Sequence, residues 1–236
     1  MATTSFANKY ALVRGNLFFR IYGSTGPWTP FGPTKDSGLE MSIEKTTLTS
    51  GDDGSVLDER QVAKTATFGT TLQSLSDSNL GIAMQSVVRT SPAVTDQPFS
   101  LPAMTVGQVL FLAPSLDSVT LAGVTEGVDY SLNKAGGKLV ALKALTAAEG
   151  TYDADEHVEM GILAGENKSF ELMYDATAES GIMLRIYKWN PSPAQNVSLN
   201  AGNEHTALAL TGACIADDNA SADDELGRFG RIVRVK

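Results

Sequence analysis

The chain has 236 residues, of which 42% are hydrophobic and 19% charged, with 22 glycines and a formal net charge of −9. The hydrophobic fraction is sufficient for a folded core and excludes global disorder. The acidic balance argues against a protein that grips nucleic acid, because phosphate binding needs clustered Lys and Arg. Few charges, many glycines and many short apolar runs are typical of an all-β protein rich in turns.

The single cysteine, Cys214, lies in an apolar strand-like run, and a disulfide within the chain is excluded. No stretch approaches the roughly 20 apolar residues of a transmembrane helix, and the first residues lack the continuous apolar segment of a signal peptide. We therefore expect no membrane association and folding in a reducing cytoplasm.

The N-terminal part of the chain predicts an arm followed by strands. Residues 1–10 are small and polar and predict a flexible arm. Three strands of alternating apolar residues are expected after it, at about Ala11–Tyr22, Leu39–Glu44 and Gln61–Leu72. The segment Lys45–Arg60 is polar and centred on Gly51–Gly54, which predicts a long loop between the last two strands. Such loops are often functional, although a hairpin tip without a function is the alternative.

A helix and an insertion are expected next. Residues Ser74–Ser86 are the best helix candidate, because Ser76 or Asp77 can cap a segment with apolar residues three or four positions apart. The composition shifts at Asp96. Short strands are expected beyond it, at about Ser118–Leu121, Val128–Leu132, Lys138–Leu142 and Glu156–Leu163. We predict that residues 96–165 form a small inserted β-unit and that residues 1–95 and 166–236 form the main core.

The last third of the chain alternates apolar and polar residues almost without interruption. The alternating runs are Lys168–Tyr174, Gly181–Trp189, Glu204–Ala213 and Gly227–Lys236. Alternation with a period of two indicates a sheet with one buried face and one solvated face. Together with the earlier strands, these runs predict an all-β fold with one short helix.

Catalytic and metal-binding patterns are weak. His157 and His205 are the two histidines, and no nucleophile motif accompanies them, so we interpret His205 as an exposed strand-end residue. The acidic segment Asp217–Glu225 resembles a calcium loop in its alternate oxygens. However, Ala222 replaces the turn glycine and Arg228 occupies the position of the closing glutamate, which favours a solvated acidic loop. We predict no catalytic residue, no cofactor and no metal.

One short stretch combines bases with aromatic residues. Arg185 and Lys188 flank Ile186 and Tyr187, and Trp189 follows. This mixture could contact nucleic acid, but one such stretch on an acidic protein favours packing on a sheet surface instead.

The order of these segments resembles a known family. A glycine-led first strand (RGNLFFRIYG, residues 14–23) precedes the polar segment Lys45–Arg60 and the helix candidate SLSDSNLGIAMQS. The turn-centred segment GVTEGVDYSLNKAGGKLVAL (residues 123–142) and the alternating C-terminal runs follow. This order resembles the major tail tube proteins of long-tailed bacteriophages over most of the chain.

The resemblance implies a fold and a function. The fold would be a β-sandwich or half-open barrel of the tail tube type, with one helix and, here, a small β-rich insertion on the outer surface. Six subunits would form a ring, and rings would stack into the tube that conducts phage DNA into the host without binding it specifically. Other partners would be the tail tip or initiator, tail terminator and tape-measure proteins. The protein would belong to the virion tail and be assembled in the host bacterial cytoplasm.

The resemblance also implies roles for individual residues. In the family a long loop after the second strand reaches the adjacent ring, which here places inter-ring contacts at Leu48, Asp52, Asp53 and Leu57. The lumen of such tubes is usually acidic, and Glu40 and Glu44 are the lumen-facing candidates. The acidic loop is a secondary contact candidate, through Asp217, Asp218, Asp223 and Asp224.

Two other classes of function stay open. A β-sandwich adhesion module, or a capsid or tail decoration module, would show the same alternation but would not form tubes. A hydrolase using loop carboxylates would need a pocket with strongly perturbed pKa values.

Overall fold

The computed structural model describes residues 14–197, 207–219 and 227–235. Strands account for 56% of the residues and helices for about 5%. The predicted all-β fold with one short helix is therefore confirmed. A second helical segment that was not predicted, α2 (Thr177–Ser180), is a single turn between two strands. The predicted N-terminal arm, residues 1–10, lies outside the described residues.

The chain divides into two compact units, one inserted in the other. Unit 1 comprises residues 1–87 and 161–236, and unit 2 comprises residues 88–160. Unit 2 thus begins at Val88 rather than at Asp96 and ends at Met160 rather than at Gly165. The difference has a physical cause. Strands β5 (Val87–Ser91) and β12 (His157–Gly161) pair as a two-stranded ribbon where the chain enters and leaves the insertion.

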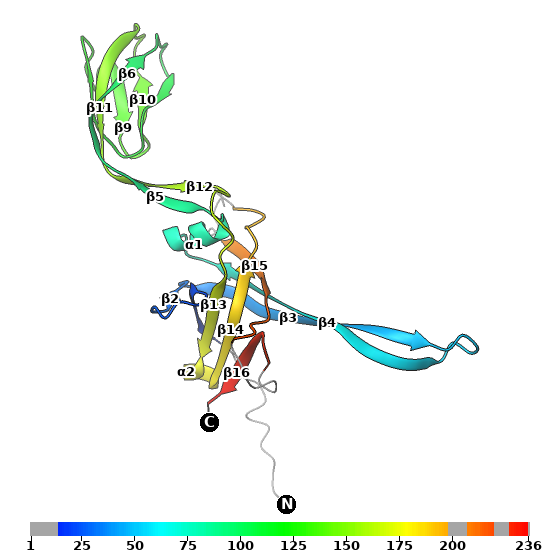
Figure 1. Cartoon of the computed structure of the whole chain (residues 1–236). Helices are drawn as coiled ribbons and strands as arrows, with labels where there is room; N and C mark the ends of the chain where they lie inside the picture. The colour runs from blue at the N-terminus through cyan, green and yellow to red at the C-terminus, as the bar shows by residue number, and fades with distance from the viewer. Residues whose placement is uncertain (1–13, 198–206, 220–226, 236) are drawn as a thin grey trace, which may run out of the picture. The chain divides into compact units, whose positions relative to one another are not determined.

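Unit 1 is built on one eight-stranded sheet (Figure 1). Its order is β2-β1-β13-β14-β15-β4-β3, and β16 pairs with β14 outside this path. The strands are β1 (Asn16–Ile21), β2 (Thr29–Pro30), β3 (Thr34–Thr49), β4 (Val56–Leu72), β13 (Phe170–Ala176), β14 (Ile182–Pro191), β15 (Leu208–Cys214) and β16 (Gly230–Arg234). The sheet divides along β14, because residues 189–191 pair with β15 whereas residues 182–186 pair with β16.

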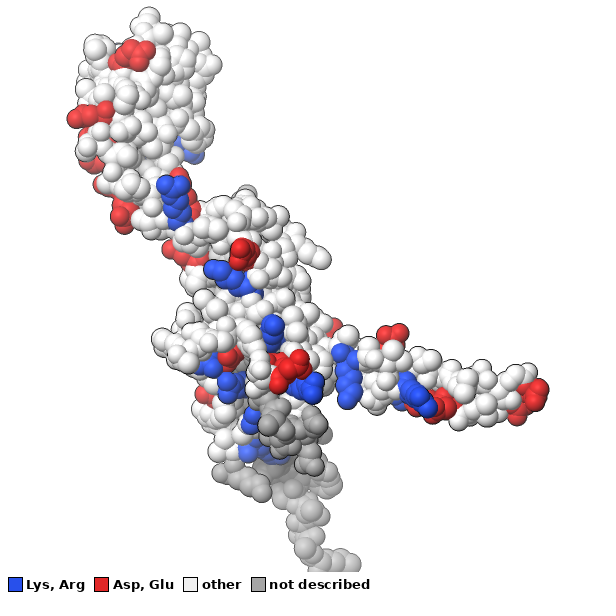
Figure 2. Space-filling model, in the orientation of Figure 1, with Lys and Arg blue, Asp and Glu red and all other residues white. Residues whose placement is uncertain are grey.

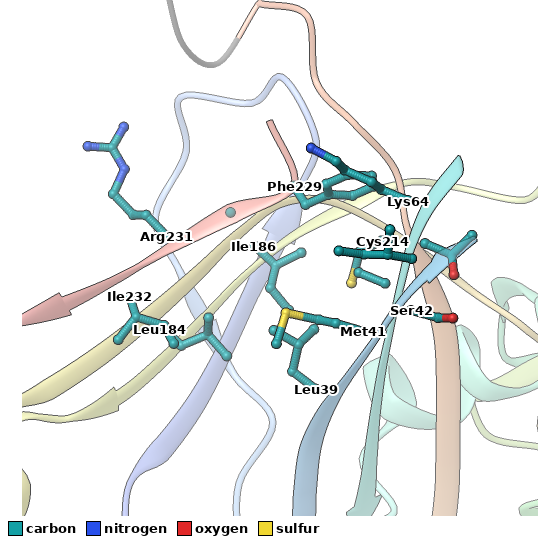
Figure 3. A pocket seen from close by; sticks show the side chains of 14 residues that line it. Leu39, Met41, Ser42, Lys64, Leu184, Ile186, Cys214, Phe229, Arg231 and Ile232 are labelled. Carbon is teal, nitrogen blue, oxygen red and sulfur yellow. The ribbon is translucent and has the colours of Figure 1, made fainter. Parts of the chain in front are cut away.

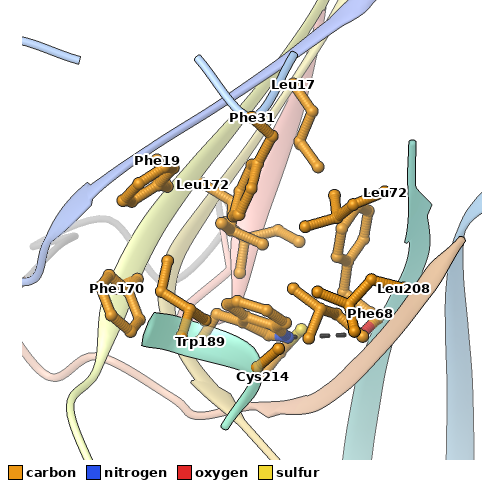
Figure 4. Packing of buried hydrophobic residues seen from close by; sticks show 14 of the residues in the cluster. Leu17, Phe19, Phe31, Phe68, Leu72, Phe170, Leu172, Trp189, Leu208 and Cys214 are labelled. Atoms are coloured by element: carbon orange, nitrogen blue, oxygen red, sulfur yellow. Dashed lines mark hydrogen bonds between the residues drawn. The ribbon is translucent and has the colours of Figure 1, made fainter. Parts of the chain in front are cut away.

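A chain of aromatic rings forms the core of unit 1 (Figure 4). The ring of Phe19 lies 4.4 Å from that of Phe31 and 5.8 Å from that of Phe170, centroid to centroid. Trp189 is fully buried, and its ring contacts those of Phe170 and Phe68. Its indole Nε1 donates a hydrogen bond of 3.3 Å to the carbonyl oxygen of Phe68. Strands that are not neighbours share this core, so the sheet must be curved.

The helix α1 (Asp77–Ala83) is the one predicted, although it is shorter than the predicted Ser74–Ser86. Ser76 caps it, because its side-chain oxygen accepts a hydrogen bond of 3.3 Å from the backbone amide of Asn79. The side chain of Asn79 is fully buried and donates through Nδ2 to the carbonyl oxygens of Phe31 and Ser74, each at 2.9 Å. This amide ties the helix to the loop that carries the Phe31 ring.

Unit 2 is a small β-sandwich with a core of its own. Its two three-stranded sheets have the orders β7-β10-β9 and β6-β11-β8. The strands are β6 (Val94–Leu101), β7 (Val109–Phe111), β8 (Leu116–Leu121), β9 (Tyr130–Asn133), β10 (Lys138–Ala141) and β11 (Ala148–Ala154). Leu101 and Leu139 are fully buried at its centre. Strand β9 begins at Tyr130 rather than at Val128, because Asp129 accepts a hydrogen bond from the amide of Thr125 and closes a turn.

The prediction of a loop over Lys45–Arg60 is wrong. Strand β3 continues to Thr49 and β4 begins at Val56, so only residues 50–55 form a turn. A ribbon that is solvated on both faces needs no apolar alternation, so the period-two signal for a strand is lost there. The β-branched residues Thr46, Thr47 and Thr49 were the remaining indication of a strand.

The buried amide of Asn79 gives a test of the fold. Replacing it by alanine, Asn79→Ala, should lower the free energy of unfolding by about 2–3 kcal/mol, because two carbonyl oxygens lose their donor and a cavity remains. Denaturant unfolding at low protein concentration, followed by tryptophan fluorescence, measures this. The exposed Ser78→Ala on the same helix should change the value by less than about 0.5 kcal/mol. Equal effects of the two substitutions would contradict this account of the helix.

Candidate interaction surface

A hairpin arm of unit 1, which we define as residues 40–62 of β3, β4 and their turn, is exposed at every residue except the half-buried Ser50 (Figure 1). Its large apolar side chains have exposed fractions from 50% to 75%, and they are Met41, Ile43, Leu48, Val56, Leu57 and Val62. An isolated two-stranded hairpin is at best marginally stable in water. Exposed apolar side chains in such numbers are typical of an interaction site.

The four predicted inter-ring contact residues all lie at the outer end of the hairpin arm. Leu48 and Leu57 are 61% and 64% exposed. Asp52 and Asp53 lie in the turn, where the hydroxyl and the amide of Ser55 both donate to Asp53 and hold the pKa of its carboxyl below the ordinary value. The structure thus brings these four residues together.

The charges of the hairpin arm are partly paired. Lys45 forms an ion pair with Glu59 across the two strands. Arg60 donates to Asp58 over 2.8 Å. These pairs leave the carboxylates of the turn as the outermost charges of the hairpin arm.

An apolar groove of about 520 Å³ lies where β3 passes β14 and β16 (Figure 3). Its walls are mainly aliphatic, and they include Leu39, Met41, Ile43, Leu184, Ile186 and Ile232. Cys214, the last residue of β15, lies opposite both Trp189 and Ala66 in the sheet. Beyond Cys214, β14 pairs with β16 instead of β15, and the groove opens at this division of the sheet.

Two sheet edges flank the apolar groove. Among the described strands, β3 pairs only with β4, and β16 pairs only with β14. Unpaired edges present rows of backbone donors and acceptors that attract another strand. An open edge beside an apolar groove is therefore suited to receive an extended segment of a partner.

Glu40 and Glu44, the predicted lumen-facing residues, are exposed on β3. They alternate along the strand with Met41 and Ile43, which line the apolar groove. Their carboxylates are thus on the opposite face of the strand from the apolar groove.

The acidic loop is described only in part. Asp217 is 8% exposed, and its Oδ1 accepts from the hydroxyl of Tyr22 at 2.9 Å and from the amide of Asn219 at 3.0 Å. The hydrogen bond to Asp217 raises the pKa of Tyr22. Asp217 therefore faces the interior of the chain's own fold, where its carboxylate is needed as an acceptor. Asp218 is exposed and pairs with Arg228 at 2.9 Å, whereas Asp223 and Asp224 lie outside the described residues.

Of the two histidines, one lies in the described part of the chain. His157 lies on β12, where its Nε2 is 3.4 Å from a carboxylate oxygen of Glu159. His205 lies outside the described residues. Within the described part of the chain, no group of three or more His, Cys, Asp or Glu side chains could hold a metal ion.

The chain belongs to the family described as Protein of unknown function UCP028589, whose model matches residues 10–233. No curated protein matches the chain. Among the described residues, no helix has the length and hydrophobicity that crossing a membrane requires.

Sequence reasoning did not find the apolar groove. Its residues come from five separate segments, and Phe229, Arg231 and Ile232 meet Leu39 only through the pairing of β16 with β14. The alternation in the C-terminal runs placed these residues in strands, but it did not indicate that the sheet divides.

The thiol of Cys214 tests the packing at the apolar groove. Burial raises its pKa to about 11, and the side chain is 5% exposed. At about pH 8 the native protein should react with a thiol reagent at least about a hundredfold more slowly than the denatured protein, and the rate should rise with pH towards the raised pKa. A reaction as fast in the native state as in denaturant would show that the end of β15 is open.

Proposed function

We propose that this protein is the structural subunit of a bacteriophage tail tube, in which hexameric rings stack into a channel for DNA. The observation that carries the proposal is the pair of open sheet edges, β3 and β16, on either side of an apolar groove. The order of segments in the sequence supports the same reading.

A second copy of this chain is the occupant that we propose for the apolar groove. The β3 edge of one subunit and the β16 edge of the next are different surfaces, so their pairing is head to tail and can close into a ring. Pairing would satisfy the backbone groups of both edges and cover Met41, Ile43 and Ile232, which are 75%, 50% and 67% exposed. The sheet of each subunit would then continue into the next.

The hairpin arm supports contacts between rings. In this proposal Leu48 and Leu57 supply apolar contact to the adjacent ring, and Asp52 and Asp53 supply charge. The arm is long enough for this role, because β3 continues for six residues beyond Ile43, its last residue in the apolar groove, at about 3.3 Å per residue.

The charge of the chain is compatible with passage of DNA. The net charge of −9 would repel phosphates from a channel wall rather than hold them. In the proposal Glu40 and Glu44 face the lumen, and the protein resides in the virion tail after assembly in the host cytoplasm. Its other partners would be the tip or initiator, terminator and tape-measure proteins.

A decoration or adhesion module is the second candidate. Unit 2 favours it, because this unit is a β-sandwich with a separate core and could act as a binding module by itself. The two candidates differ in assembly, since a decoration module would not form tubes.

Electron microscopy of negatively stained, concentrated protein tests the proposal. The wild-type protein should form rings with sixfold symmetry or hollow tubes. The substitution Ile43→Lys places a charge in the apolar groove and should abolish rings and tubes, because a partner strand would have to bury an unpaired ammonium group.

The control is Val106→Lys, which changes an equally apolar residue of unit 2 that is 67% exposed. It should leave assembly unchanged, and both variants should keep the circular dichroism of the wild type. Rings formed by Ile43→Lys at wild-type yield would contradict the role of the apolar groove. Monomers at every concentration of the wild type, alone and with preformed tail tips, would favour the decoration module.

A further inference from the structure

A surface of unit 1 beside the apolar groove combines four cations with three aromatic rings, and one of the cations, Arg231, also borders the groove. We call it the basic-aromatic face, and it consists of Arg20, Tyr22, Trp28, Arg185, Tyr187, Lys188 and Arg231. These residues come from β1, β14 and β16 and from the segment after β1. Arg185 and Lys188 belong to the stretch of bases and aromatic residues seen in the sequence, whereas Trp189 of that stretch is buried in the core.

Each cation of the basic-aromatic face lies over an aromatic ring. The guanidinium of Arg20 is 4.6 Å from the ring centroid of Trp28. The ammonium of Lys188 is 4.9 Å from that of Tyr22. The third ring, that of Tyr187, holds the guanidinium groups of Arg185 at 5.6 Å and Arg231 at 5.5 Å. Such stacking fixes side chains that would otherwise be long and mobile.

Carboxylates neutralise only part of this charge. Glu171 on β13 is 7% exposed, and a single oxygen, Oε2, accepts from Arg20 at 2.7 Å and from Arg185 at 3.1 Å. Asp217 lies at the margin and is occupied by the hydroxyl of Tyr22. Lys188 and Arg231 contact rings, and within the described residues neither forms an ion pair with a carboxylate. Among the described residues, the face therefore keeps a positive charge on a chain whose net charge is −9.

The hairpin arm carries the opposite charge. Between Thr46 and Arg60 the chain has four carboxylates, of Asp52, Asp53, Asp58 and Glu59, and one cation, that of Arg60. The outermost two carboxylates lie in the turn. In Figure 2 the far end of the hairpin arm is acidic, whereas basic side chains gather where β13, β14 and β16 lie. One chain thus presents two surfaces of opposite sign.

We propose that the basic-aromatic face is the docking site for the acidic end of the hairpin arm of a second copy of this chain. The hairpin arm extends away from β13 and β14 of its own sheet, so its own end does not cover this face (Figure 1). The contact is heterologous, and it therefore propagates from one subunit to the next. It rests on the proposed function, because it supplies the receptor for the arm that joins successive rings.

The arrangement favours a protein carboxylate over nucleic acid. Cations held on rings and on Glu171 lose little further freedom when they bind, which suits a small number of carboxylates on a narrow ribbon. Duplex DNA presents phosphates over a longer track and would also meet the repulsion of an acidic protein. The tests below distinguish binding of nucleic acid to this face from docking of the hairpin arm.

Charge exchange between the two surfaces tests the proposal. The variant D52K/D53K changes only exposed turn residues, and K188E/R231E changes the face without touching the two arginines on Glu171. Each double variant should reduce the tubes recovered by sedimentation by at least about tenfold at low salt. The chain that combines all four substitutions should recover to within about threefold of the wild type, because the two charges are exchanged.

The control is K134E, which reverses an exposed lysine of unit 2 and should leave sedimentation unchanged. Loss of tubes with retention of single rings in both double variants supports the docking site. Wild-type yield of tubes from D52K/D53K overturns it. Failure of the wild type to form even rings counts against the proposed function and not against this contact.

A binding measurement tests the same contact independently of whether rings or tubes form. A cyclic peptide of residues 46–60 should bind the full chain saturably, and K188E/R231E should weaken the binding at least about tenfold. The absence of saturable peptide binding to the wild type overturns the proposal. A duplex oligonucleotide that bound where the peptide did not, with the same loss in K188E/R231E, would overturn it in favour of nucleic acid.

Discussion

The packing of Trp189 is the constraint on which the rest of unit 1 depends. Its ring contacts the rings of Phe170 on β13 and Phe68 on β4, and its Nε1 donates a hydrogen bond to the carbonyl oxygen of Phe68. Gly212 on the neighbouring strand leaves the space for it, because a Cβ at that position would lie 2.5 Å from Nε1. The pairing of β14 with β15 is confined to this short stretch around Trp189. The sheet therefore divides at a point that the core determines.

The division of the sheet creates the features that we connect with assembly. Because β15 ends at Cys214, β14 is free to pair with β16, and the space between β16 and β3 becomes the apolar groove. The same division leaves β16 and β3 as separate open edges. A sheet that closed on itself would have neither edge and would not offer a head-to-tail contact. In the proposed ring, closure is achieved between subunits instead of within one.

Each contact that we propose joins two unlike surfaces. The hairpin arm and the basic-aromatic face are different surfaces of opposite charge, and the two sheet edges are also different from one another. Contacts between unlike surfaces extend an assembly in one direction, whereas contacts between like surfaces end it as a dimer. In the proposal, the two sheet edges join neighbouring subunits around a ring, and the hairpin arm and the basic-aromatic face join successive rings along the axis.

The sequence by itself determined the all-β class, the helix capped by Ser76 and the strands of the C-terminal third, because local periodicity and capping chemistry are written in neighbouring residues. It placed the acidic residues of the hairpin arm near a turn but did not reveal the strands on either side, since a doubly solvated ribbon lacks apolar alternation. Only the tertiary structure decided that Asp217 faces inward. It also decided that Arg20 and Arg231 share one face and that Leu39 and Ile232 line one groove, because those contacts join strands far apart in the chain.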